Sequence, residues 1–182
     1  MTYFKSSDIA IMALSSALWG VLNSIFSPIF FQMFGLPILC DLIGFSVLTV
    51  SAWWTRKLGS ITMIGFIATM INFIFNPGAI HFLGFTAASI VFDIAVWFVR
   101  YDNAFKKTVN IAISMVSIST LSATVAGFII GTFFMVAPAL ARWGGAVGWA
   151  AMHGVGGVGG GVIGVILVEA LVARGIPSKD HR

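Results

Sequence analysis

Long apolar runs recur along the whole chain, and each one ends at a turn residue or a charged residue. Unsatisfied backbone groups are too costly in lipid, so each run should be helical, and one span takes about 20 residues. A porin-like barrel would instead need alternating strands of about ten residues. The pattern predicts an all-α integral membrane protein, a single six-helix transmembrane bundle over 1–182. Its spans are expected at roughly 9–27, 38–54, 60–76, 79–99, 108–136 and 146–173.

The stretch from Ser27 to Pro37 is apolar and aromatic, is bounded by prolines, and carries Gln32. We expect Pro28 to end the first helix, because proline breaks the helical hydrogen-bond pattern. The stretch would then be a loop outside the bundle. Two interpretations stay open: the loop lies at the membrane interface, which aromatic residues favour, or it folds over a pocket as a lid.

The composition fits a bilayer rather than water as the solvent. Apolar residues make up 59% of the chain and charged residues 9%, against ordinary values of about 45–50% and about 25%. This excludes a soluble enzyme, a disordered protein and a nucleic-acid-binding domain. The single cysteine, Cys40, excludes an intramolecular disulfide. The segment Met1–Asp8 is too short for a signal-peptide n-region and cleavage site, so the first run is expected to be a retained helix.

The basic residues set the expected orientation in the membrane. With six spans, nine of the ten basic residues fall on one side, in the two terminal tails and in the gaps after the second and fourth spans. Only Arg142 falls on the other side. Because cytoplasmic loops carry the excess of Lys and Arg, both termini are expected in the cytoplasm.

Polar and aromatic residues gather in the half of the bundle that this orientation places outside. Polar residues within spans often mark function, and polar groups among aromatic walls are typical of a small-molecule site. The candidate substrate-binding residues are Gln32, Asp41, Asn72, Asn76, His81, Arg142, Trp143, Trp149 and His153. Asp41 would pair with Arg142 or meet a cationic ligand. The histidines would contact a ligand or form helix-to-helix hydrogen bonds.

Two acids lie toward the inner ends of their spans, each near an arginine. Asp93 precedes Arg100 by about two helical turns, and Glu169 precedes Arg174 by about one and a half. Ion pairs at the inner face, or a contact with a partner protein, explain these acids better than ligand binding does.

Small residues recur at helix-packing spacings in the first and last spans. Ala10, Ala13 and Ala17 mark one face of the first span, and Ser16-x-x-x-Gly20 lies beside them. Such patterns let another helix approach closely. The seven glycines between 154 and 164 lack the Lys-Ser or Lys-Thr of a phosphate loop. They indicate close packing in the bundle or, alternatively, a flexible backbone near a ligand.

The chain resembles the S-components of energy-coupling-factor (ECF) transporters, which are small membrane subunits that capture vitamins or metals. The similarity is carried by the six predicted spans, by Ala13-x-x-x-Ala17, by the stretch 54–59 (WTRKLG) and by the Asn76-Pro77-Gly78 turn. The last two are similar to the thiamine and hydroxymethylpyrimidine branch. The chain lacks the Met-His start of nickel and cobalt S-components, so no metal is expected.

The resemblance implies a vitamin importer in a prokaryotic plasma membrane. Its partners would be a transmembrane T-component, which meets Ala10, Ala13 and Ala17, and two cytoplasmic ATPases. The loaded subunit would topple in the membrane to deliver its vitamin. The chain itself would have no catalytic residue and no cofactor. Asp41, His153, Trp143 and Trp149 suit a cationic aromatic ligand such as thiamine.

Three other classes of function stay open. A self-contained channel or small secondary carrier would transport alone, with the glycine-rich last span lining or flexing the path. An intramembrane enzyme would convert a substrate alone, although the chain offers no nucleophile elbow and no HExxH motif. A structural or assembly subunit would neither transport a solute nor convert a substrate.

Overall fold

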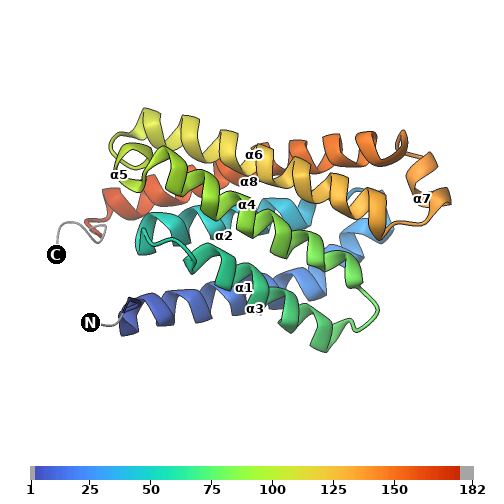
Figure 1. The fold of residues 1–182 in the computed structure, drawn as a ribbon, viewed down its shortest axis with the longest axis horizontal. Helices are drawn as coiled ribbons and strands as arrows, with labels where there is room; N and C mark the ends of the chain where they lie inside the picture. The colour runs from blue at the N-terminus through green and yellow to red at the C-terminus, as the bar shows by residue number, and fades with distance from the viewer. Residues whose placement is uncertain (1–2, 177–182) are drawn as a thin grey trace.

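Helices make up nearly all of the computed structural model, which describes residues 3–176. No strand occurs among these residues. The six long described helices are α1 (Ser6–Phe34), α2 (Ile38–Thr55), α3 (Ser60–Phe75), α4 (Leu83–Val99), α6 (Thr108–Phe133) and α8 (Gly145–Ala173) (Figure 1). Short helices join some of them: η1 (Ile80–Phe82), α5 (Tyr101–Ala104) and α7 (Ala137–Ala141).

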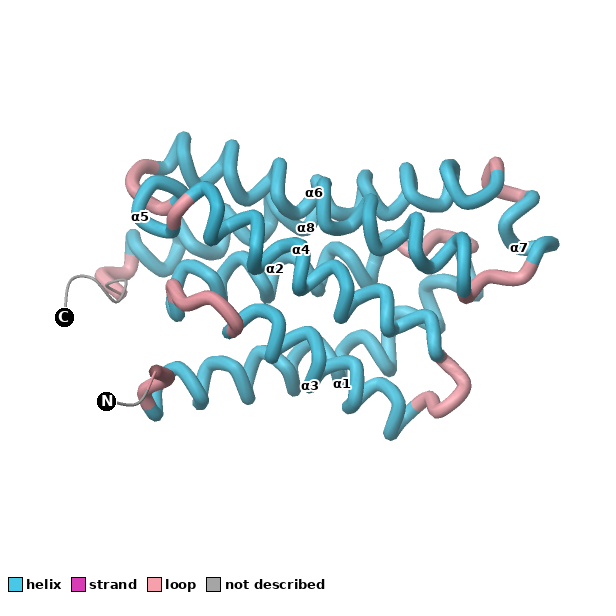
Figure 2. The backbone as a smooth tube through the Cα atoms, in the orientation of Figure 1, coloured by secondary structure: helices cyan, strands magenta, loops and turns pink. Residues whose placement is uncertain are grey.

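The long helices run along one common direction and alternate up and down through the bundle. The start of α1, the end of α8 and α5 lie at one end, and α7 lies at the other with the α1–α2 and α3–α4 connections (Figures 1 and 2). The basic residues Lys5, Arg56, Lys57, Arg100, Lys106, Lys107 and Arg174 belong to the first end, which we call the basic end. Among the described basic residues, Arg142 belongs to the opposite end. Lys179 and Arg182 lie outside the described residues.

Five described helical segments are long and apolar enough to cross a membrane: α1, α2, the segment Ile80–Val99, α6 and α8. The third predicted span forms α3, which is apolar but has 16 residues, shorter than a typical span. Many large apolar side chains point outward, including Ile74, Phe98, Phe133 and Val147. Lipid tails would cover such side chains at no cost, so the chain is compatible with a multi-pass membrane protein.

The expectation that Pro28 ends the first helix is wrong. Helix α1 continues through Pro28 to Phe34 and ends at Gly35, whose left-handed backbone (φ 68°) lets its N–H donate to Phe31 O at 2.7 Å. Proline is tolerated within membrane helices where neighbouring helices and hydroxyl side chains satisfy the freed backbone groups. Most of the residues expected to form an outer loop, 27–34, are therefore the last two turns of a helix, and only 35–37 connect it to α2.

Helix α8 packs against α2 on one side and against α6 on the other, through glycines. A Cβ added at Gly160 would lie 2.5 Å from Asp41 O, and one at Gly157 would lie 2.6 Å from Ser119 O. Neither position could hold a side chain without moving the backbone of the neighbouring helix. The predicted close packing of this glycine-rich segment is confirmed.

The two small-residue patterns of α1 lie on different faces of the helix. Ser16 is buried and donates a hydrogen bond to Ile64 O of α3, and Gly20 lies against Ile71 of the same helix. Ala10, Ala13 and Ala17 are exposed instead. One pattern therefore packs α1 within the bundle, while the other faces outward.

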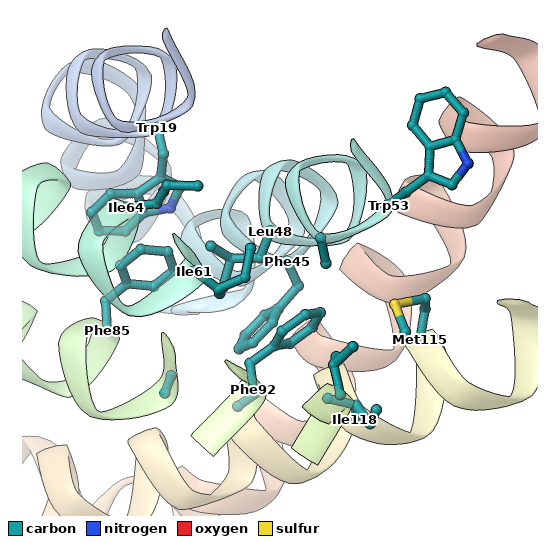
Figure 3. Packing of buried hydrophobic residues seen from close by; sticks show 14 of the residues in the cluster. Trp19, Phe45, Leu48, Trp53, Ile61, Ile64, Phe85, Phe92, Met115 and Ile118 are labelled. Atoms are coloured by element: carbon teal, nitrogen blue, oxygen red, sulfur yellow. The ribbon is translucent and has the colours of Figure 1, made fainter. Parts of the chain in front are cut away.

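Aromatic side chains fill much of the core between α1, α2 and α4 (Figure 3). The rings of Trp19 and Phe85 stack with centroids 3.7 Å apart, and Phe45 lies 6.2 Å from Phe92. Trp19, Phe45 and Phe92 are almost completely buried. This packing holds the three helices firmly together below the cavity described next.

Asp93 caps α3 and does not pair with Arg100, so the expected ion pair is wrong. Its Oδ2 accepts hydrogen bonds from Gly59 N at 2.8 Å, Thr62 N at 3.0 Å and Thr62 Oγ1 at 2.9 Å. Its Oδ1 accepts one from Tyr101 OH at 3.2 Å. Asp93 therefore satisfies backbone donors that the first turn of α3 leaves without a partner within the helix.

The second expected pair, Glu169 with Arg174, does not form within the part of the chain that the structure describes. The ion pairs at the basic end are instead Asp8 with Lys57, at 2.9 Å, and Arg56 with Asp102, at 4.0 Å. They connect segments far apart in the sequence and help hold this end of the bundle together.

Candidate functional site

A cavity of about 340 Å³ opens at the end of the bundle opposite the basic end. Its walls come from the second half of α1, the start of α2, the segment 76–88, the end of α6 and the start of α8. All these parts of the helices meet at the same end because the helices alternate in direction. The volume is within the range of about 300–1,000 Å³ that is usual for small-molecule sites.

Asp41, in the first turn of α2, faces His153 of α8 at the floor of the cavity. Both side chains are buried, and Asp41 Oδ2 lies 2.8 Å from His153 Nδ1. The two atoms are close enough to share a proton, but their alignment does not complete a hydrogen bond, and neither atom has another partner among the residues that the structure describes. Buried polar atoms are nearly always satisfied, so this pair calls for a further partner.

Trp149 stands one helical turn from His153 on α8 and adds a donor to the floor. Its ring centroid lies 5.7 Å from that of His153 and 6.1 Å from that of Phe31. Its Nε1 is buried and finds no hydrogen-bond acceptor among residues 3–176. The indole therefore offers a ligand both a flat apolar face and a free N–H.

A second aromatic wall faces the cavity from α1 and α4. Trp19 and Phe85, the stacked pair of the core, both line it. Trp19 Nε1 donates to Cys40 O at 3.2 Å, which connects this wall to the first turn of α2. The ring stack and this hydrogen bond set the orientation of Trp19 at the cavity.

The rim of the cavity carries the predicted residues Gln32, Asn76 and His81. Gln32 is exposed and lies in the part of α1 that follows Pro28. Asn76 ends α3, and its Nδ2 has no hydrogen-bond partner in the described ranges. The last turns of α1 thus line the cavity as a helix end, through Ser27, Pro28, Phe31 and Gln32.

Six of the nine predicted site residues line the cavity: Gln32, Asp41, Asn76, His81, Trp149 and His153. Asn72 does not. It lies one turn deeper on α3, where its Oδ1 accepts hydrogen bonds from Asn23 Nδ2 at 2.8 Å and Ser24 Oγ at 3.0 Å. It therefore joins α3 to α1, which is the helix-to-helix role that polar residues often have in membranes.

Arg142 and Trp143 also lie outside the cavity lining, in the connection between α7 and α8. The Arg142 guanidinium lies 5.6 Å from the ring centroid of Trp143. Both side chains lie close to Gly35, and so they cover the end of α1. Of the two alternatives for Asp41, the pairing with Arg142 is wrong, because the side chain opposite Asp41 is His153.

Sequence reasoning missed several residues of the lining, notably Trp19, Phe31, Cys40 and Phe85. The three aromatic residues occur in ordinary apolar runs, where nothing distinguishes a cavity wall from a lipid-facing surface. Cys40 could have been found through its position next to Asp41. Its Sγ, a carboxylate oxygen of Asp41 and a ring nitrogen of His153 all lie within 4.8 Å of one another, and these three residue types can bind a metal.

Comparisons with protein-family models, with curated proteins and with solved structures gave no match for this chain. The geometry of the cavity, together with the short sequence motifs, must therefore carry any assignment of function. A cavity with aromatic walls, a buried acid–base pair and unpartnered donors can bind and orient a small solute. These residues provide recognition by charge, hydrogen bonding and stacking.

Proposed function

We propose that this protein is the substrate-binding membrane subunit of an ATP-driven vitamin importer, of the ECF S-component type. Its substrate would be a small water-soluble vitamin or precursor, with thiamine-related compounds favoured. The observation that carries the proposal is the floor of the cavity, where polar atoms of Asp41, Trp149 and His153 are buried without hydrogen-bond partners among the described residues. A bound solute would supply those partners.

The chemistry of the lining favours a flat cation. The Asp41 carboxylate would attract a positive charge in surroundings that screen it poorly. Trp149 and the Trp19–Phe85 wall would stack on an aromatic ring and interact with its charge. Asn76 Nδ2 and Trp149 Nε1 would donate hydrogen bonds to ring nitrogens or hydroxyl groups. A pyrimidine with a cationic neighbour, as in thiamine, meets all three requirements.

The position of the cavity supports capture from outside the cell. It opens opposite the basic end, and basic connections are usually cytoplasmic. In a prokaryotic plasma membrane with both termini inside, the cavity would then face outward. A six-span arrangement requires α3 to cross as well, with tilt or local thinning of the bilayer.

The outward face of α1 supports a partner subunit. Ala10, Ala13 and Ala17 are exposed on the outside of the bundle, and small residues let a second helix approach closely. In the proposed complex this face meets a transmembrane T-component, and two cytoplasmic ATPases supply the energy. Neither a catalytic residue nor a cofactor is assigned to this chain.

The direct experiment uses purified protein in detergent without partners. Small molecules released from it are identified by mass spectrometry, and its melting temperature is followed during titration with thiamine, hydroxymethylpyrimidine, riboflavin and biotin. We expect a thiamine-related compound to co-purify or to stabilise the protein. A folded protein that neither retains nor responds to any of these vitamins would contradict the proposal.

A transport assay separates the proposed subunit from a self-contained carrier or channel. The protein is reconstituted alone in liposomes, and uptake of labelled thiamine is measured with and without an ion gradient. A binding subunit should bind thiamine without moving it across the membrane. Sustained uptake by the protein alone would contradict the proposed function.

A further inference from the structure

We propose that Cys40, Asp41 and His153 form a binding site for a divalent transition-metal ion, with Zn²⁺ as the reference ion. The site lies at the floor of the cavity. This inference goes beyond the proposed function. It uses the Asp41 and His153 atoms that the proposed function assigns to a solute, so the metal ion and a cationic vitamin would be alternative occupants of this floor.

The first support is distance. The thiol sulfur, one carboxylate oxygen and one imidazole nitrogen all lie within 4.8 Å of one another. In a tetrahedral zinc site with bonds of about 2.0 to 2.3 Å, neighbouring ligand atoms are about 3.3 to 3.8 Å apart. To reach these separations, Asp41 Oδ2 and His153 Nδ1, now 2.8 Å apart, would move slightly apart, and the longer separations of up to 4.8 Å would shorten.

The second support is that two of the three groups, Asp41 and His153, have buried polar atoms without a completed hydrogen bond. Asp41 Oδ2 and both ring nitrogens of His153 are buried and lack hydrogen-bond partners in the part of the chain described. Asp41 Oδ2 and His153 Nδ1 nevertheless lie 2.8 Å apart without the alignment of a hydrogen bond. A carboxylate oxygen and an imidazole nitrogen this close can share a cation, which is either a proton or a metal ion.

The types of ligand decide which metals fit. Thiolate and imidazole favour borderline and soft ions such as Zn²⁺ and Co²⁺, whereas Mg²⁺ and Ca²⁺ prefer sites made of oxygen atoms. The Cys40 thiol donates to Pro37 O at 2.7 Å. On binding, the metal would take the place of the thiol proton, which would be released to solvent.

The surrounding helices hold the ligands and leave one side open. Gly156 of α8 faces Asp41, and a Cβ there would lie 2.6 Å from Asp41 Oδ2. The lack of a side chain at this position gives the carboxylate its room beside His153. Three protein ligands leave a fourth position for water or a solute, and all three residues line the cavity.

Metal binding is measured on the intact protein with Zn²⁺ and Co²⁺. Zinc affinity is determined by competition with a chromogenic chelator. Cobalt is used for its absorption spectrum, because a sulfur ligand gives a charge-transfer band in the near ultraviolet. The variants are Cys40→Ser, Asp41→Asn and His153→Gln. The matched control is Asp102→Asn, which removes an exposed acid at the basic end.

We expect the wild-type protein and Asp102→Asn to bind one Zn²⁺ with equal affinity and to show the sulfur band with Co²⁺. Each variant at the site should bind Zn²⁺ at least tenfold more weakly, and Cys40→Ser should lose the band. Absence of the band from the folded wild-type protein would overturn the proposal without any variant. Zinc binding that survives in Cys40→Ser at wild-type affinity would overturn it as well.

Parallel measurements of zinc binding and thiamine binding distinguish failure of the metal site from failure of the proposed function. Chelator-treated protein is titrated with thiamine in parallel with the zinc measurement. Thiamine binding without stoichiometric zinc binding overturns the metal site alone. Zinc binding with the sulfur band, in protein that binds no vitamin, supports the metal site and removes the vitamin proposal.

Discussion

Asp41 on α2 and His153 on α8 face each other inside the bundle, with Oδ2 and Nδ1 2.8 Å apart. The two residues are far apart in the sequence and meet because α8 presents glycines to α2. Gly156 lies against the Asp41 side chain, and Gly160 lies against the Asp41 carbonyl. The close approach of these helices therefore places an acid and a base together at the floor of a cavity.

Replacing Gly156 with alanine tests this dependence. The added Cβ would lie 2.6 Å from Asp41 Oδ2, so Asp41 must move away from His153. We expect Gly156→Ala to lower the free energy of unfolding by about 1–3 kcal/mol, as overpacking does, and to weaken thiamine binding. Gly78→Ala is the control, because a Cβ added at Gly78 would meet no other atom within 4 Å. Equal stability and affinity in the two variants would contradict the packing account.

The placement of Asn72 outside the cavity gives a second prediction. Asn72→Ala removes the acceptor for Asn23 Nδ2 and Ser24 Oγ. A buried donor left without a partner costs about 1–3 kcal/mol. We expect that loss in denaturant titrations, with thiamine affinity unchanged in the folded variant. The exposed Asn103→Ala should affect neither quantity, and a selective loss of affinity in Asn72→Ala would return that residue to the site.

Tyr101 predicts a specific response to alkaline pH. Burial first, and then the nearby Asp93, raise the pKa of Tyr101 above its ordinary value. The unfolded chain would therefore release the phenolic proton from a pH of about 10, while the folded protein keeps it. Stability should fall as the pH rises above that value, and it should fall less in Tyr101→Phe. Melting temperatures from pH 8 upward check this, and parallel curves would contradict it.

The exposed alanines of α1 lead to the prediction that a variant can lose assembly with partner subunits and still bind its ligand. Ala13→Trp places a large side chain on the exposed face that the proposal assigns to the T-component. We expect it to prevent co-purification with the transporter partners while leaving thiamine affinity within about twofold. Ile113→Trp, on the exposed surface of α6, is the control and should assemble normally. Normal assembly of Ala13→Trp would contradict the assignment of this face.

The apolar runs predicted the long helices well, because in a membrane protein hydropathy and helix length are tightly connected. The run at 38–54 became Ile38–Thr55, and the run at 146–173 became Gly145–Ala173. Pro28 was misjudged, since tolerance of a proline within a helix depends on neighbours that the sequence does not show. The short helices α5 and α7 left no recognisable signal.

The sequence predicted how deep each polar residue lies along the bundle, but not which neighbour its side chain meets. Because position along a helix sets depth in the bundle, these polar residues were correctly predicted to lie near one end. The neighbour that each side chain meets depends on how the helices pack. Asn72 and Asn76 are one turn apart on α3, yet one bonds to Asn23 and the other lines the cavity. Trp19 in the wall and Trp97 on the outer surface look alike in the sequence.

The most direct test of the central claim is a calorimetric titration of purified protein with thiamine, comparing the wild type with Asp41→Asn. The variant keeps the size of the side chain and removes the negative charge that the proposed function assigns to Asp41 at the cavity. We predict that the wild type binds thiamine with defined stoichiometry and that folded Asp41→Asn binds it at least tenfold more weakly. Equal affinity in the two folded proteins would contradict recognition by this cavity.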